Sequence, residues 1–211
     1  MTPQACRNFY AALRAANPQP RTELLYESPY QLLIAVILSA QATDRSVNAA
    51  TRGLFRVAPS PAAMVELGLT RLKHHIRTIG LYNSKAKHVM ATSRQLIERH
   101  KGEVPSERTA LEELPGVGRK TANVVLNTAF GEPTIAVDTH IFRVANRTGL
   151  ARGSTPRAVE NRLMAVTPAE FRRDAHHWLI LLGRYICKAR RPECPRCPVR
   201  HWCRYPHKVL A

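Results

Sequence analysis

Four of the five cysteines stand in one short C-terminal run, Cys187, Cys194, Cys197 and Cys203, with six, two and five residues between them. Soft ligands spaced this closely can all reach one point, so the run must fold around a shared centre or pair into disulfides. The chain begins with an amphipathic segment and not with the apolar core of a secretory signal. We therefore expect a cytoplasmic setting, where disulfides are rare and grouped cysteines favour a metal centre.

The spacing of these cysteines leaves the kind of metal open. Structural zinc sites usually use two close cysteine pairs separated by a longer insert, and here only Cys194 and Cys197 form a close pair. A [4Fe–4S] cluster also takes four cysteine ligands, and its greater width tolerates uneven loops. The fifth cysteine, Cys6, lies at the opposite end of the chain and has no assigned role.

The formal net charge of +17 indicates an anionic partner. Lysine and arginine are spread over a chain that is 45% hydrophobic, so a folded body and not a disordered tail carries the charge. Nucleic acid is the first expectation for such a body. An anionic membrane surface is the competing one, and it is disfavoured because no helical segment combines a basic face with exposed Trp, Phe or Leu. The longest apolar run, residues 32–38, is too short to span a bilayer.

The pattern of caps and apolar residues predicts an all-α fold, because no alternating strand pattern of useful length occurs. Serine, threonine, asparagine or aspartate precedes most of the helical segments, and Ser28, Asn83 and Asp138 are examples of such caps. The expected helices cover residues 28–39, 46–55, 62–67, 70–78, 84–100, 106–113, 119–130, 139–147 and 155–165, and a last one runs from Pro168 to the cysteines.

Residues 114–120, Leu-Pro-Gly-Val-Gly-Arg-Lys, join two of these helices through a turn. Gly116 and Gly118 lack Cβ atoms, so the backbone can take positive φ and approach a ligand closely. The turn leads into a helix N-terminus, which favours an anion such as a nucleic-acid phosphate. An ordinary helix–helix turn is the alternative. The preceding proline, the basic pair that follows and the net charge favour phosphate binding.

The hairpin at 114–118 is similar to that of the helix-hairpin-helix DNA glycosylases. Residues 136–140, Ala-Val-Asp-Thr-His, resemble the catalytic aspartate segment of that family. The cysteine run resembles the cluster motif of its endonuclease III branch, and residues 39–44 and 79–83 resemble the DNA-contacting loops of the same branch. The matches run in order from about residue 24 to Cys203, and they favour [4Fe–4S] over zinc.

The resemblance implies two helical domains with the active site in the cleft between them. A six-helix barrel with the hairpin would cover residues 22–132, and an iron–sulfur cluster domain would combine residues 1–21 with 133–211. The implied activity is that of a bifunctional DNA N-glycosylase and AP lyase, which removes oxidised pyrimidines from duplex DNA and also cleaves at abasic sites. We expect a monomer at the bacterial nucleoid, in the cytoplasm, with no membrane partner.

Two residues are expected to carry the chemistry. From the residues alone, Lys120 is either a phosphate-binding lysine or a nucleophile whose pKa is lowered by the helix N-terminus and by Arg119. The resemblance implies the nucleophile, which would form a Schiff base with the sugar. Asp138 is a helix cap, and the resemblance adds a pairing with Lys120. His140 is either a structural histidine or a DNA contact.

Other residues are expected to hold the duplex. Gln41 and Leu81 could be an ordinary loop amide and a packing leucine. The resemblance implies that Gln41 fills the gap left by an extruded base and that Leu81 wedges the opposite strand. The cations of the loop between the first two cysteines form either a solvated face or a phosphate clamp, and they are Lys188, Arg190 and Arg191.

Two other kinds of protein would share part of this pattern. An adenine-excising relative usually lacks a lysine at the position of Lys120 and carries a long C-terminal domain, and this sequence ends eight residues after Cys203. A non-catalytic helix-hairpin-helix protein with a zinc or iron–sulfur centre would not need Lys120 together with Asp138. Both alternatives are therefore disfavoured.

Overall fold

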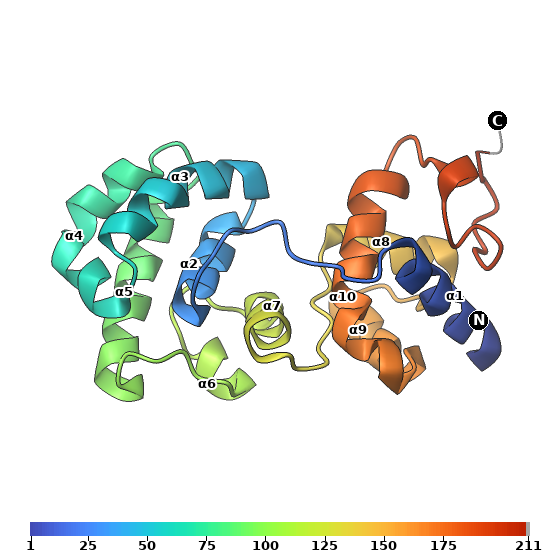
Figure 1. Ribbon diagram of the computed structural model, residues 1–211, viewed down its shortest axis with the longest axis horizontal. Coiled ribbons are helices and arrows are strands. Elements are labelled where there is room, and N and C mark those ends of the chain that lie inside the picture. The colour runs from blue at the N-terminus through green and yellow to red at the C-terminus, as the bar shows by residue number, and fades with distance from the viewer. Residues whose placement is uncertain (210–211) are drawn as a thin grey trace. The chain divides into compact units, whose positions relative to one another are not determined.

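The computed structural model describes residues 1–209, and every regular element among them is helical, which confirms the expected all-α class (Figure 1). In that part of the chain, no helix is both long and apolar enough to cross a bilayer. The elements are α1 (Pro3–Ala16), α2 (Pro29–Ser39), α3 (Asp44–Val57), α4 (Pro61–Ile76), α5 (Tyr82–His100), α6 (Arg108–Glu112), α7 (Arg119–Phe130), α8 (Thr139–Thr148), α9 (Pro156–Val166), η1 (Ala169–Phe171), α10 (Arg172–Leu181), η2 (Leu182–Ile186) and η3 (Cys194–Arg196).

The helices form two compact units. The first, here called the hairpin unit, is Thr22–Gly131 and holds α2 to α7. The second, here called the cysteine unit, combines Met1–Arg21 with the chain from Glu132 onwards, and it holds α1, α8 to α10 and the cysteine run. The chain therefore leaves the cysteine unit after α1 and returns to it before α8.

Helix α2 forms the centre of the hairpin unit. The Ser28 Oγ accepts a hydrogen bond from the Gln31 N–H at 3.2 Å, and Pro29 occupies the first turn, where its missing N–H costs nothing. Every residue from Tyr30 to Leu38 is buried, because α2 packs against α3, α5 and α7. A helix that is apolar all round must be surrounded in this way.

Three helix starts and one helix interior differ from expectation. The Thr43 Oγ1 caps α3, so Ser46 lies inside that helix and does not begin it. Helix α5 begins at Tyr82 after Leu81, and Asn83 is not its cap. Helix α6 begins at Arg108, two residues after Ser106. The two helices expected at 62–78 run as α4, with a break at Gly68, whose φ of 79° is non-helical.

The core of the cysteine unit ties the two ends of its chain together. Tyr10 of α1 stacks on Phe171 with ring centroids 5.7 Å apart, and its hydroxyl hydrogen-bonds the Thr167 hydroxyl at 2.9 Å. The Trp178 Nε1 donates to the Asn17 carbonyl at 2.8 Å. Cys6 is buried in the same core, so its surroundings are those of a packing residue.

Helix α10 continues into a π-helical turn, η2, which ends directly before Cys187. Such turns are rare and often mark functional segments. Gly183 of this turn packs against α8, where an added Cβ would lie 2.8 Å from the Cβ of His140. The contact lets α8 and η2 approach closely, and it fixes the point from which the cysteine run departs.

Candidate active site and metal centre

The hairpin before α7 uses its two glycines differently. Gly116 has a φ of 79°, and a Cβ there would lie 2.9 Å from the Cβ of His88, so both backbone and packing require glycine. Gly118 has a φ of −95°, which any residue can adopt, and a Cβ there would meet no atom within 4 Å. The expected need for positive φ therefore holds for Gly116 alone. Gly118 is the N-cap of α7, and it has no side chain to cap the first N–H groups.

Lys120 is the second residue of α7, and its side chain is exposed. Its neighbour Arg119 lies 3.8 Å from the Glu112 carboxylate, Nη1 to Oε1. This contact partly compensates the guanidinium charge, so Arg119 repels the Lys120 ammonium group less than expected. The helix N-terminus also disfavours a positive charge at this position.

Gln41 and Leu81 share an unusual backbone. Their φ angles are 56° and 60°, in the left-handed region that few non-glycine residues adopt. Both side chains are exposed, and Leu81 is 63% exposed, which is unusual for a large apolar residue. Strained, exposed residues of this kind gather at functional sites. Among residues 1–209, the other non-glycine residue with positive φ is Lys101, which ends α5.

Asp138 is the N-cap of α8, as expected. Its Oδ1 accepts a hydrogen bond from the Ile141 N–H at 2.8 Å, and its side chain is half-buried. Lys120 belongs to the hairpin unit and Asp138 to the cysteine unit. His140 follows in the first turn of α8, where its Nδ1 lies 3.3 Å from the Nη2 of Arg143. This contact gives His140 a partner within its own unit.

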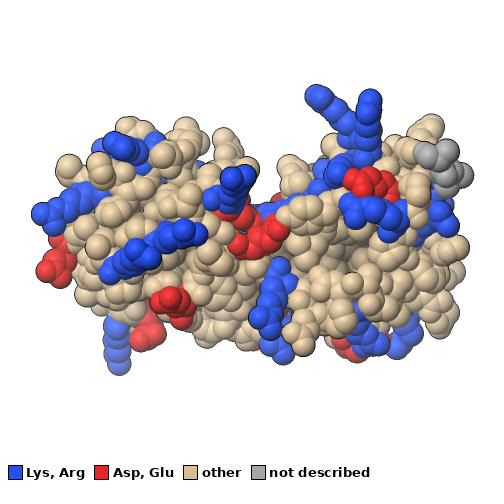
Figure 2. All heavy atoms as spheres, turned by 45° about the horizontal axis from the view of Figure 1, so that its top comes forward, with Lys and Arg blue, Asp and Glu red and all other residues tan. Residues whose placement is uncertain are grey.

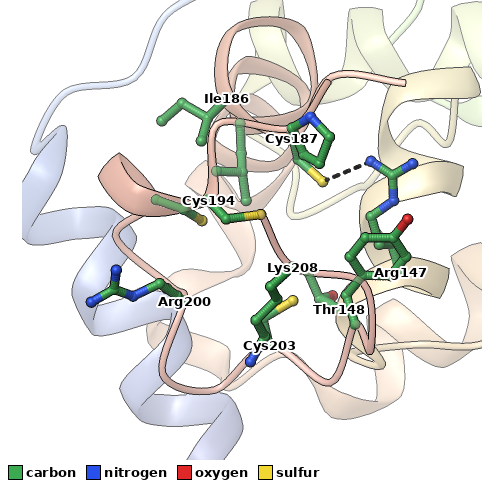
Figure 3. A pocket seen from close by; sticks show the side chains of 12 residues that line it. Arg147, Thr148, Ile186, Cys187, Cys194, Arg200, Cys203 and Lys208 are labelled. Atoms are coloured by element: carbon green, nitrogen blue, oxygen red, sulfur yellow. Dashed lines mark hydrogen bonds between the residues drawn. The ribbon is translucent and has the colours of Figure 1, made fainter. Parts of the chain in front are cut away.

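The four C-terminal cysteines line one pocket, and Figure 3 shows the sulfur atoms of the labelled cysteines around a common space. Short turns bring them together: the Cys197 N–H donates to the Cys194 carbonyl at 3.2 Å, and the Cys203 N–H donates to the Val199 carbonyl at 3.1 Å. All four thiols are free, so the structure forms no disulfide among them.

The donor set of this pocket is four thiols, which suit either a zinc ion or a [4Fe–4S] cluster. A zinc ion needs four ligands within about 2.3 Å of one point. Within residues 1–209, no three His, Cys, Asp or Glu side chains are grouped closely enough for that. A [4Fe–4S] cluster takes one thiolate on each iron, so its ligands lie further apart. Burial and neighbouring thiols raise the pKa of Cys197 to about 11, and burial also raises the pKa of Cys203.

The basic loop after Cys187 carries less free charge than expected. The Lys188 ammonium group forms an ion pair with Glu193, which also pairs with Arg196. The hydrogen bonds from Arg196 and Lys188 lower the pKa of the Glu193 carboxyl group. Arg190 and Arg191 remain exposed. Elsewhere the positive charge is dispersed, and Figure 2 shows Lys and Arg scattered over the visible face with acidic groups between them.

Comparison with known proteins decides the family. Residues 34–169 match the HhH-GPD superfamily of base excision DNA repair proteins. The chain belongs to this superfamily. It is 63% identical to Endonuclease III of Escherichia coli (strain K12) over 197 residues, with 93% of each chain covered. It is 62% identical to Endonuclease III of Haemophilus influenzae over the same length and coverage.

Solved structures of DNA repair proteins are similar to this chain. A non-covalent Endonuclease III–DNA complex and a trapped Endonuclease III–DNA covalent intermediate each match with a TM-score of 0.90 at 45% identity. Both comparisons cover 97% of this chain and 96% of the other. A thermostable thymine-DNA glycosylase matches with a TM-score of 0.86 at 25% identity over 98% of both chains.

Two arginines of this HhH-GPD chain contact the cysteine segment, and the sequence patterns did not single them out. Arg147 donates to the carbonyls of Lys188 and Ala189 at 2.7 and 3.0 Å, and its Nη1 lies 3.7 Å from the Cys187 Sγ. Arg143 donates to the carbonyls of Cys187 and Gly183 at 3.0 and 2.8 Å. Their spacing of four residues puts both on one face of α8. That spacing is the one signal in the sequence that could have pointed to them.

Proposed function

We propose that this HhH-GPD protein is a bifunctional DNA N-glycosylase and AP lyase, which acts as a monomer on oxidised pyrimidines in duplex DNA and uses Lys120 as its nucleophile. The observation that carries the proposal is the exposed Lys120 in the first turn of α7, two residues after a glycine N-cap. Support comes from the family assignment and from the related Endonuclease III that was trapped as a covalent intermediate with DNA.

The hairpin would bind the DNA backbone. The first N–H groups of α7 and the helix dipole favour a phosphate, and the open space at Gly118 lets the phosphate approach the backbone. Extrusion of the damaged nucleotide costs a few kcal/mol, because stacking and pairing are lost. Gln41 and Leu81 would offset this cost, since they can occupy the vacated stack and separate the opposite strand.

The chemistry needs the neutral amine of Lys120. Its nitrogen lone pair attacks C1′ of the extruded nucleotide, the glycosidic C–N bond breaks, and the base leaves with the bonding electrons and takes up a proton. The ring then opens to an imine between the lysine nitrogen and C1′. Loss of a proton from C2′ forms the C2′–C3′ double bond and breaks the bond between C3′ and the phosphate oxygen. Water finally hydrolyses the imine and restores Lys120.

Asp138 would act as a carboxylate beside this reaction. Its Oδ1 accepts the Ile141 N–H, which holds the carboxylate in place, and the carboxylate could accept the proton that Lys120 must lose. The same negative charge stabilises the positive charge that develops on the sugar as the base departs. This role requires that the two units present Lys120 and Asp138 to one nucleotide, and that arrangement is part of the proposal.

The ligands of a [4Fe–4S] cluster would be Cys187, Cys194, Cys197 and Cys203. Their common pocket supports this choice, because all four are free thiols that line it. When bound, the cluster would supply a rigid tie between the turns of the C-terminal segment. The loop with Arg190 and Arg191 starts at the first ligand, so the tie would hold these cations in place for backbone phosphates.

The test of the proposed function is Lys120→Gln with borohydride trapping on duplex DNA that contains an abasic site. Glutamine cannot form an imine, so trapping and strand cleavage should be abolished while binding to abasic DNA is nearly retained. The matched control is Lys87→Gln, which removes an exposed lysine of α5 and should trap normally. In parallel, Asp138→Asn should keep the helix cap but lower base excision about 100-fold. Trapping by Lys120→Gln at wild-type yield would show that another amine is the nucleophile.

A further inference from the structure

Lys85 is a buried lysine within the hairpin unit. It belongs to the first turn of α5, and its side chain is 5% exposed. Lysine is almost never buried this fully without a paired carboxylate. Within residues 1–209, Lys85 has no carboxylate within ion-pair distance, and burial lowers the pKa of its ammonium group. The side chain therefore needs an explanation other than surface charge or an ordinary ion pair.

The bonding partner of Lys85 lies at the end of another helix. Its Nζ donates to the Leu38 carbonyl at 2.9 Å. Leu38 is next to the last residue of α2, so its carbonyl is one of the four that the helix itself leaves without a partner. Gln41 follows Leu38 by three residues and lies inside the turn that the Ala42 N–H closes on the Ser39 carbonyl at 3.0 Å.

The backbone of Lys85 is bonded to the other loop. Its N–H donates to the Leu81 carbonyl at 3.0 Å, which closes the first turn of α5 behind the left-handed Leu81. Lys85 therefore forms a hydrogen bond next to both the Gln41 loop and the Leu81 loop. Its main chain bonds the Leu81 loop, and its side chain bonds the end of the helix that leads into the Gln41 loop.

We propose that Lys85 is a positioning residue that sets the Gln41 loop and the Leu81 loop against each other, so that both side chains enter the duplex together. The inference rests on the proposed function, because that function assigns the two side chains to the opened base pair. Lys85 itself touches no substrate. Its effect should be confined to the step that opens the duplex, and the reaction at C1′ should be spared.

The variant that tests this role is Lys85→Met, which keeps much of the side-chain length and removes the donor to Leu38. Lys85→Gln is the second variant, since its side chain is shorter than that of lysine and carries no charge, and it should behave as Lys85→Met does. Lys87→Met is the matched control, because it removes one positive charge from the exposed side of the same helix. Thermal unfolding of each protein separates a folding defect from a local one.

Two substrates separate opening from chemistry. The first carries an oxidised pyrimidine paired within a duplex, and the second carries the same lesion in an unpaired bubble that is already unstacked. Lys85→Met should lower single-turnover excision about ten-fold on the duplex and leave excision from the bubble within about two-fold of wild type. An equal loss on both substrates, or no loss on either, would overturn the proposal.

A third measurement is independent of excision. A 2-aminopurine placed beside an abasic site in duplex DNA brightens when the stack is opened, so it reports loop entry on binding alone. Wild type and Lys87→Met should raise the fluorescence, and Lys85→Met should not. An equal rise with Lys85→Met, or no rise with wild type, would refute the role of Lys85. Failure of wild type to excise or trap would instead refute the proposed function, while a rise lost only in Lys85→Met would still support the positioning role.

Discussion

Gly116 and Gly118 stand two residues apart in one hairpin, and different constraints act on them. Gly116 is fixed by its positive φ and by the close His88 side chain, so it serves the fold of the hairpin. Gly118 has an extended backbone and empty space where a Cβ would point, so nothing in the folded chain requires glycine there. A requirement at Gly118 must come from what approaches the N-terminus of α7.

This difference predicts that alanine at one position lowers stability and that alanine at the other lowers DNA binding. Gly116→Ala should lower the free energy of unfolding by about 1 kcal/mol or more, because alanine is strained at this φ and its Cβ meets His88. Gly118→Ala should leave stability almost unchanged and weaken binding to duplex DNA. Urea unfolding and a DNA-binding titration on both variants check the prediction. A loss of stability at Gly118 equal to that at Gly116 would contradict it.

Sequence patterns located residues better than they located contacts. The glycine hairpin, the cap at Asp138 and the shared pocket of the four cysteines all follow from local spacing. The burial of Lys85 and the ion pair of Lys188 with Glu193 do not follow from local spacing. Each depends on the position that another part of the chain takes in the fold. The roles assigned to Lys120 and Asp138 stay predictions.

At the scale of elements, several helix starts were predicted closely, and two of them carry a proline signal. Ser28 with Pro29 and Thr155 with Pro156 mark the starts of α2 and α9, because proline in the first turn leaves few alternatives. The predicted start of α5 was wrong, because no local sequence signal indicates the left-handed conformation of Leu81. Tertiary packing and the turn before it set that start.

Helix α8 is the element that holds the cysteine run in place. Arg147 bonds two carbonyls of the loop after Cys187, lies close to the Cys187 sulfur and places its guanidinium 4.7 Å from the centre of the Tyr205 ring. One side chain therefore touches both ends of the run. Contacts of this kind, made to metal ligands by residues that do not bind the metal, orient the ligands and tune the properties of the metal.

We expect Arg147→Met to loosen this segment. The loss of the hydrogen bonds to the loop carbonyls should lower the free energy of unfolding by about 2 kcal/mol and speed the release of iron to a chelator. Iron and sulfide analysis of the purified protein and a chelation time course make the measurement. Arg190→Met, which removes an exposed arginine of the same loop, should keep the wild-type rate. Zinc at one ion per active chain, without iron, would contradict the cluster.

At the scale of the whole molecule, the charge of +17 is dispersed over both units. A dispersed charge gives affinity for any duplex, because each phosphate contact releases counterions. Under the proposed function, recognition of damage would come from the strained and exposed loop residues Gln41 and Leu81. This separation of general affinity from local recognition suits a protein that has to scan long stretches of intact DNA.

The salt dependence of binding to undamaged duplex tests this division. Affinity should fall steeply between low and physiological salt, and Arg190→Ala or Arg191→Ala should each flatten the logarithmic slope by about 1. Lys188→Ala is the matched control and should change the slope less, because its ammonium group is already paired with Glu193. Binding that is indifferent to salt, or equal effects of all three variants, would speak against the clamp.

The shared core of α1 with α10 also has a consequence for the order in which the protein is made. Helix α1 leaves the ribosome before the hairpin unit, yet its packing partners Phe171 and Trp178 are synthesised only after that unit. The hairpin unit is continuous, so it can fold while the remainder is still being translated. Throughout that time the apolar side of α1 has no native surface to cover it. During translation, α1 is therefore a segment of the nascent chain that is exposed to aggregation.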